Sequence, residues 1–453
     1  MFSYCPDLLR SHVIPPEIWE SILMDICEEA SERHEDSMFS FNAARDHLCL
    51  ASDDFDRIIR SSVMFWLRLA ISCDTTPDAV CRHLTCLGSA SVKLDVKIIL
   101  FPEYDSSTNA YTGQAASVPD FELPSYVRRA TDSLLAAIPS AHLWSTAVIS
   151  ASTTHFMRPI LAVFRNVYAP SLHSLSFVCP RNEAVCDRLF NIPPVMFGGI
   201  LPGLTSLSLF NALLPWGNPG YFSGLKVFQI VELSDSLWPT YQQLVQTWQA
   251  APSMHTLMVP SSGVNLGWDC PRPGSGAILP SLTSLTIDGS MGGNGIIVAL
   301  VSLSLPALRH WTVRDLDCRC WDVALGLVGL RDLESLILQG RMDDSAHVAP
   351  LYTRLHSLAL LDLHLGDNQY FHMLALDAGV CPSLRHLIVG DVLVHDLLIY
   401  VARRALHARL KLTHVESSCS VNISYAVGPR VLILVVSNLF DSWFEAVLAL
   451  ALR

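Results

Sequence analysis

Two short clusters of cysteine, histidine and aspartate contain the residues best suited to hold a metal. Residues 81–86 (CRHLTC) and 315–320 (DLDCRC) could each supply two or three ligands. A zinc site normally pairs such a cluster with a second, similarly spaced one, because the ion takes four ligands. Neither cluster has a second pair. We therefore expect structural cysteines and no metal.

A glycine-rich run and two histidines are the other candidates for chemistry. Residues 289–295 (GSMGGNG) lack both the G-x-G-x-x-G order and the P-loop lysine that phosphate binding needs. His310 and His386 fall on a predicted sheet surface and are better suited to binding than to catalysis. The sequence has no G-x-S-x-G or H-E-x-x-H motif. We predict that the chain is not an enzyme and uses no cofactor.

The strands that would position such side chains are predicted by a recurring apolar triplet with the spacing Leu-x-x-Leu-x-Leu. Its nine starts are 32, 21, 29, 28, 26, 25, 22 and 29 residues apart, an average of 26.5. Leucine-rich repeats are about 20–29 residues long. The triplets begin at Leu172, Leu204, Leu225, Met254, Leu282, Leu308, Leu333, Leu355 and Leu384.

Proline stands two residues before six of these triplets, where it would separate each return segment from the next strand. Stacked repeats bury one continuous core that no single repeat could form. The pattern predicts an α/β solenoid, an irregular leucine-rich-repeat horseshoe, over residues 165–415. The usual Asn or Cys after the third apolar position is missing, so we expect uneven curvature.

Further elements are predicted on both sides of the repeats. Residues 72–164 should connect to the repeats and supply the first strands, with a mobile loop at 102–125. Residues 416–453 should form a C-terminal strand and a capping helix. The individual predictions are strands at 92–100, 142–149, 408–415 and 431–436 and a helix at 439–450.

Residues that alternate with the buried apolar positions should form the concave face of the solenoid. This face is nearly uncharged, with Ser357 and Ala359 representing the eighth repeat. Such a surface suits a protein or peptide partner rather than phosphate; alternatively, its hydroxyls satisfy backbone groups and the loops bind the partner. The predicted partner-binding residues are Ser284, Thr286, Asp288, His310, Thr312, Arg314, Ile337, Gln339, His386 and Ile388.

Composition and charge exclude several classes of protein. Hydrophobic residues make up 51% of the 453 residues and charged residues 16%, which excludes a disordered chain. The net charge of −12 argues against nucleic acid binding. Only residues 431–452 approach a membrane span, and charged residues interrupt them. With no secretory signal and 13 scattered cysteines, we expect a cytoplasmic or nuclear protein with no membrane partner.

Residues 13–71 are predicted to form a compact helical unit. Pro15-Pro16 precede residues with helical apolar spacing, and a second helical pattern runs from Leu48 to Ile59. The run from Ile14 to Leu23, then Leu48-x-Leu50-Ala51-x(3)-Phe55-x(2)-Ile58 and Trp66, resembles an F-box. Together with the repeats, the chain resembles the F-box-like/leucine-rich-repeat proteins that are abundant in fungi.

The resemblance implies a function. In that family the helical unit docks on the Skp-type adaptor of a cullin–RING (SCF-type) ubiquitin ligase, and the repeats capture the target protein. The implied adaptor-binding positions are Ile14, Pro15, Ile18, Ile22, Leu23, Leu50, Phe55, Ile58 and Trp66.

The sequence departs from the family pattern in its acidic residues. Residues 27–43 form a longer acidic connector, and Asp53 and Asp54 replace basic residues. An acidic face would weaken association with an acidic adaptor. The alternative is therefore a repeat scaffold with a degenerate F-box.

Lysine is rare: Lys93, Lys97, Lys226 and Lys411 stand against 26 arginines. A protein that works beside a ubiquitin-transferring enzyme would benefit from few acceptor amines. Codon usage in a GC-rich genome is the preferred explanation.

Overall fold

The structure is a computed structural model, and the chain divides into two compact units, Met1–Tyr221 and Phe222–Arg453. Each unit is described by itself. The described residues are 15–32, 37–88, 92–100, 104–105, 110–111, 125–151, 154–179, 195–212, 214, 216, 218–233, 238–260, 277–289, 300, 303–315, 332–340, 355–365, 381, 383–389, 414–417, 421–427 and 432–437.

The first unit begins with helices α2 (Pro16–Glu32), α3 (Ser37–Ala51) and α4 (Asp53–Ser61) and the 3-10 turn η1 (Val63–Trp66). Two predictions are wrong here. Most of the acidic connector 27–43 is helix, because its Glu, Ala and Met residues favour helix and continue α2 and start α3. The second helical pattern is split at Ser52, whose hydroxyl caps α4 by accepting from the Asp54 amide.

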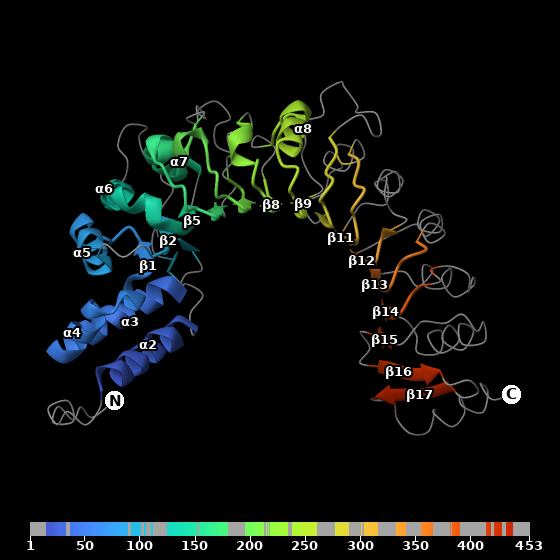
Figure 1. The fold of residues 1–453 in the computed structure, drawn as a ribbon, viewed down its shortest axis with the longest axis horizontal. Coiled ribbons are helices and arrows are strands. Elements are labelled where there is room, and N and C mark those ends of the chain that lie inside the picture. The colour runs from blue at the N-terminus through green and yellow to red at the C-terminus, as the bar shows by residue number, and fades with distance from the viewer. Residues whose placement is uncertain are drawn as a thin grey trace. The chain divides into compact units, whose positions relative to one another are not determined.

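A parallel sheet follows directly, in the order β1 (Arg68–Ile71), β2 (Leu94–Leu100), β5 (Trp144–Ala151), β6 (Ser174–Val178) and β7 (Ser206–Phe210). Helices α5 (Pro77–Leu87), α6 (Ser125–Ala137) and α7 (Thr154–Val163) lie between successive strands in the chain (Figure 1). The strands predicted at 92–100 and 142–149 are confirmed as β2 and β5. The sheet nevertheless starts earlier than predicted, because β1 lies inside the 13–71 segment.

Short elements complete this unit. Within the predicted loop 102–125, β3 (Tyr104–Asp105) pairs antiparallel with β4 (Ala110–Tyr111). The remaining described 3-10 turns are η2 (Ile138–Leu143), η3 (Phe164–Asn166), η4 (Phe197–Gly199) and η5 (Pro219–Tyr221).

The second unit continues the same construction with β8 (Val227–Glu232), helix α8 (Tyr241–Gln249) and β9 (Thr256–Pro260). Each later strand up to β15 pairs parallel with the one before it. These strands are β10 (Ser284–Asp288), β11 (His310–Arg314), β12 (Ser335–Gly340), β13 (Leu360–Leu365), β14 (His386–Val389) and β15 (His414–Ser417). Open parallel sheets with helical return segments agree with the α/β solenoid prediction.

The C-terminal end is antiparallel. Strand β16 (Val421–Val427) pairs with β15, and β17 (Leu432–Ser437) pairs with β16. Strand β17 confirms the strand predicted at 431–436, whereas β16 was not predicted and β15 overlaps only the end of the segment 408–415. The predicted helix 439–450 lies outside the described residues.

The register of the eighth repeat differs from the prediction by three residues. Ser335 pairs with Leu360 and Leu336 with Leu361, and Leu360 pairs in turn with His386. The buried triplet is therefore Leu358-x-x-Leu361-x-Leu363. Both registers match the apolar pattern, but the observed one starts 25 residues after Leu333 and 26 before Leu384, a more even spacing than the predicted 22 and 29.

A ladder of backbone hydrogen bonds joins the N-terminal ends of neighbouring strands, which we call the strand entrances. In seven of the eight pairs of neighbouring repeats, the carbonyl oxygen of the residue after the first apolar position accepts two amides of the next repeat, at 2.7–3.0 Å. Thr283, for example, accepts from Arg309 and His310. Glu334 accepts from Ala359 and Leu360, which independently fixes the eighth register. This ladder holds the strand entrances together without the missing Asn.

The prolines have a more specific role than a helix stop. The amide of the first apolar residue donates to the carbonyl three residues earlier, at 3.0–3.3 Å, which closes a β-turn before seven of the strands. Proline at the second position of such a turn has the required φ already fixed. The described prolines at that position are Pro170, Pro202, Pro252, Pro280 and Pro306.

The core of the strands is almost purely apolar. Within β10, Leu285 and Ile287 are fully buried while their neighbours are half-buried, and the same alternation appears in β6, in β7 and in β9 up to Val259. Trp144, Trp248 and Trp311 are the largest buried side chains. Among the described helices, none is long and apolar enough to cross a membrane.

Candidate interaction surfaces

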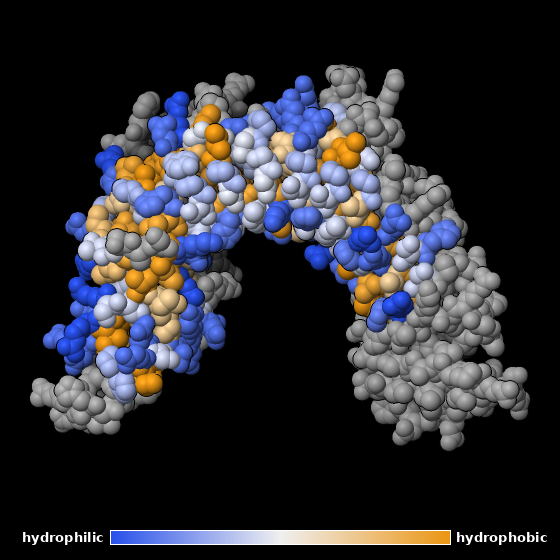
Figure 2. All heavy atoms as spheres, in the orientation of Figure 1, coloured by the Kyte–Doolittle hydropathy of each residue, from blue (hydrophilic) through white to orange (hydrophobic). Residues whose placement is uncertain are grey.

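Helix α2 has one buried face and one exposed apolar face. Leu23 and Cys27 are buried against the unit. Ile18, Ile22 and Ile26, which are 52%, 38% and 42% exposed, recur every four residues and so form one ridge. We call these three residues the α2 ridge. In Figure 2 the hydrophobic colour interrupts the hydrophilic surface over the N-terminal helices.

The structure separates the predicted adaptor-binding residues into two groups. Leu50 is 85% exposed, and Ile18, Ile22 and Pro15 are also exposed. Leu23, Phe55 and Trp66 are buried, Ile58 is half-buried, and Ile14 lies outside the described residues. Phe55 packs against Trp19 with ring centroids 5.5 Å apart. The first group can contact a partner directly, and the buried Leu23, Phe55 and Trp66 support the helices.

Two of the three aspartates of α4 form ion pairs within the helix itself. Arg57 pairs with Asp54 at 2.6 Å, and Arg60 pairs with Asp56 at 2.7 Å. Aspartates in the first turn also interact favourably with the helix dipole. Asp56 contributes, after burial, to raising the pKa of the Cys49 thiol to about 12. The acidic departure therefore has a local explanation, the start and the ion pairs of α4.

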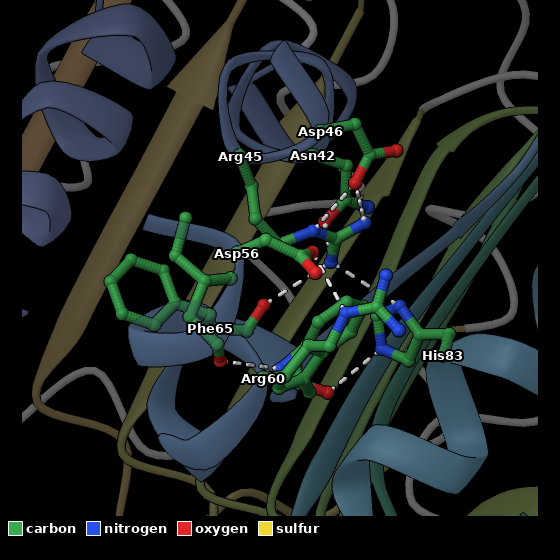
Figure 3. A network of polar contacts seen from close by, with 9 residues as sticks. Asn42, Arg45, Asp46, Asp56, Arg60, Phe65 and His83 are labelled. Carbon is green, nitrogen blue, oxygen red and sulfur yellow. Dashed lines mark hydrogen bonds and ion pairs between the residues drawn. The ribbon is translucent and has the colours of Figure 1, made fainter. Parts of the chain in front are cut away.

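A buried polar network joins α3 to η1 and α5 (Figure 3). The Arg45 guanidinium donates to Asn42 Oδ1 at 2.9 Å and to the Phe65 carbonyl at 3.2 Å. It lies 4.2 Å from the centroid of the Trp66 ring and 3.3 Å from His83 Nδ1. Trp66 Nε1 in turn donates to the Ile59 carbonyl. The network ties the helical unit to the start of the sheet.

His83 is held as a neutral base by this network. Arg45 can only donate, so His83 Nδ1 accepts, and its Nε2 donates to the Trp66 carbonyl at 2.8 Å. Burial, followed by the Arg45 charge, lowers the pKa of His83 to about 3. Both ring nitrogens are therefore already used.

The two candidate metal clusters do not form a metal site in the described residues. Cys81 is exposed, and burial raises the pKa of the half-buried Cys86 thiol, which disfavours a thiolate ligand. Of the second cluster only Asp315 is among the described residues. In the part of the chain that the structure describes, no three His, Cys, Asp or Glu residues are arranged to hold a metal ion.

The predicted partner-binding residues of the second unit share the sheet face opposite the buried triplets. His310, Arg314 and His386 are exposed. The remaining seven are half-buried: Ser284, Thr286, Asp288, Thr312, Ile337, Gln339 and Ile388. The register places Ser284, His310 and Ser335 side by side, and likewise Thr286, Thr312 and Ile337. The residues therefore lie on one face of the sheet.

The corrected register adds residues to this surface that sequence reasoning missed. Leu360 and Asp362, rather than Ser357 and Ala359, stand beside Ile337 and Ile388. Asp362 is only 9% exposed. The signal that could have revealed them is the second apolar match at Leu358, which gives the more even repeat length.

Next to this face, the strand entrances carry charged residues. Arg309 forms an ion pair with Glu334 in the neighbouring repeat. The pair lines a hollow formed by Pro306, Ala307, Arg309, Asp332, Glu334 and Ser357. Its polar lining consists of one basic, two acidic and one hydroxyl side chain.

No protein-family model matches the chain, and no curated protein matches it. Among solved structures, the chain is similar to a chain of the crystal structure of the Rad7 and Elc1 complex in yeast. The two are 12% identical, the match covers 86% of this chain and 94% of the other, and the TM-score is 0.34. This similarity is too low to support an argument about fold or function.

Proposed function

We propose that the chain is a non-catalytic receptor that links a target protein to the Skp-type adaptor of a cullin–RING ubiquitin ligase. The observation that carries the proposal is the exposed apolar surface of the helical unit. It includes Ile18, Ile22 and Leu50, three of the positions that the F-box resemblance assigns to adaptor contact. A cytoplasmic or nuclear location follows from this function.

Energetics favour an occupied surface. Full burial of an isoleucine side chain contributes about 1.5–3 kcal/mol. The α2 ridge and Leu50 leave four large apolar side chains in contact with water. A partner that covers them would gain several kcal/mol, and the buried Arg45 network supplies a rigid support. The proposal accommodates the acidic α4, because two of its three aspartates, Asp54 and Asp56, are paired with Arg57 and Arg60.

The sheet face of the second unit is the proposed target-binding surface. It combines Ser, Thr and His with apolar Ile337, Leu360 and Ile388, a mixture suited to a folded protein or an extended peptide. If so, His310→Glu together with Ile337→Glu abolishes capture of the target while adaptor binding persists. Unchanged capture would move the binding site to the loops.

The proposed adaptor interaction is tested by measuring binding of the purified full chain to a purified Skp-type adaptor. The double substitution Ile18→Glu and Ile22→Glu removes two buried apolar contacts from the complex. It should weaken binding by at least about tenfold, because a loss of about 1.4 kcal/mol in binding free energy already corresponds to that factor. Leu135→Glu, on an exposed residue of α6, is the matched control and should bind as wild type. A folded wild-type chain that binds no adaptor would instead favour a repeat scaffold.

A further inference from the structure

Helix α2 carries charge of one sign only. Its 17 residues include six acidic and no basic side chains. The fold accounts for three of the six. Glu20 accepts a hydrogen bond from Ser62 Oγ, and Glu28 pairs with Arg68. Glu17 lies in the first turn, where the helix dipole favours a negative charge.

The other three acidic residues continue the exposed face of the α2 ridge. Asp25, Glu29 and Glu32 are exposed. Ile18 and Ile22 of the ridge precede them on the same side of the helix, because the successive spacings from Ile18 to Glu32 are four, three, four and three residues. This face is therefore apolar in the first half of α2 and acidic in the second.

The acidic half of this face is unfavourable for the helix itself. Negative charge near a helix C-terminus opposes the helix dipole, and the last turn of α2 contains no basic residue. Asp25 and Glu29 are four residues apart and Glu29 and Glu32 are three, which are spacings at which like charges repel each other. Such a cost to the free chain is expected where an exposed surface serves a partner.

We propose that the adaptor groove that covers the α2 ridge is basic at the end that meets Asp25, Glu29 and Glu32. This inference rests on the proposed adaptor-linking function and adds the charge by which the adaptor is selected. Burial of the ridge would bring the basic and acidic groups into range of each other. Charges more than about 10 Å apart are largely screened at 0.1 M salt. The local charge of the groove therefore decides, even in an adaptor that is acidic overall, and a groove that is acidic at this end is repelled.

The test measures binding of the purified full chain to a purified Skp-type adaptor at low and at high salt. The triple substitution Asp25→Asn, Glu29→Gln and Glu32→Gln removes three charges and keeps the side-chain sizes. At low salt we expect binding at least about threefold weaker than wild type, since each exposed ion pair contributes modestly. The difference should vanish near 1 M salt, where the screening length falls to about 3 Å.

A matched control removes the same number of charges elsewhere in the first unit. Asp74 and Asp78 near the start of α5 and Asp132 on α6 are exposed. Their replacement by Asn should leave adaptor binding as in wild type at both salt concentrations.

Thermal melting of the free chains provides a second measurement. The α2 triple variant should melt at the temperature of wild type or higher, because the repulsion within the helix is removed. Weaker binding by a chain of undiminished stability separates recognition from damage to the fold. A variant that melts at a clearly lower temperature would overturn the inference, since the acidic residues would then support the helix.

The binding data also separate this inference from the proposed function. A folded wild-type chain that binds no adaptor overturns both. If wild type binds and the α2 triple variant binds equally well or more tightly at low salt, this inference alone is overturned. The proposed function then still stands on the loss of binding in Ile18→Glu with Ile22→Glu.

Discussion

The helical unit and the repeats of the second unit place polar and apolar residues in opposite ways. In the helical unit, Arg45 is buried with α5's His83 while the α2 ridge faces water. In the repeats, the buried triplet positions are Leu, Ile, Val, Met, Phe and Trp, and the opposite face carries Ser, Thr, His and Arg beside a few apolar residues such as Ile337. Backbone hydrogen bonds already fix the register of the repeats, so their core needs only apolar bulk. The helices lack such a ladder between them, and directed side-chain bonds fix their arrangement instead.

The largest expected effect tests the repeat core and its register together. Leu361→Ala should lower the free energy of unfolding by about 2–5 kcal/mol, because it removes a fully buried side chain. Leu360→Ala, one residue away on the opposite face, should cost much less. Chemical denaturation of both variants measures this difference. Equal losses, or a larger loss for Leu360, would restore the register predicted from the sequence.

The polar core of the helical unit is tested by Arg45→Met, which keeps much of the side-chain length. It leaves the Phe65 carbonyl and His83 Nδ1 without this donor, so we expect a loss of about 1–3 kcal/mol in the free energy of unfolding. Arg57→Met, at an exposed ion pair, is the control and should cost less than about 1 kcal/mol. Stability unaffected by Arg45→Met would show that directed bonds do not hold this core.

The pH dependence of stability distinguishes the two kinds of core further. The pKa of His83 is about 3 in the folded chain, against 6.5 for a histidine exposed to water, so the unfolded chain binds the proton first. Stability should therefore fall as pH falls from 6.5 towards 3, by at most about 1.4 kcal/mol per pH unit from this residue. His83→Gln should flatten the curve between pH 7 and 5, and His142→Gln, at an exposed residue, should leave it unchanged. Parallel curves for wild type and His83→Gln would contradict a neutral buried His83.

The smallest effect concerns the turns before the strands. Pro280→Ala should lower the free energy of unfolding by only about 0.4–1 kcal/mol, since proline mainly restricts the unfolded chain. Gly203 lies in the corresponding turn before β7, and a Cβ at this position would lie 2.7 Å from the Pro170 carbonyl oxygen. Gly203→Ala should therefore cost more than Pro280→Ala in the same thermal melts. The reverse order would argue against the tight turn packing.

The sequence was informative where one physical constraint dominates. Apolar spacing located β6 to β12 and β14, because a parallel sheet needs a buried residue at alternate positions. It failed at β13, where Leu355, Leu358, Leu360, Leu361 and Leu363 satisfy two registers and only pairing with neighbours decides. It also failed at 27–43, where acidic composition suggested a connector although helix propensity was high.

The candidate surfaces show the same limit. Sequence reasoning selected Ile18, Ile22, Leu23 and Phe55 as one group, since an amphipathic pattern alone does not state which side is covered. The partners of Arg45 in η1 and α5, Phe65 and His83, are 20 and 38 residues away from it, so no local pattern could indicate the network. Asp362 entered the sheet face only through the corrected register.

The most direct test of the central claim is hydrogen–deuterium exchange of the full chain with and without a purified Skp-type adaptor. The account predicts slower exchange in the first half of α2 and the end of α3, around Ile18, Ile22 and Leu50. Strands β10 and β11 should exchange as in the free chain, because their exposed face is reserved for the target. Protection confined to β10 and β11, or no protection anywhere in a folded chain, would contradict it.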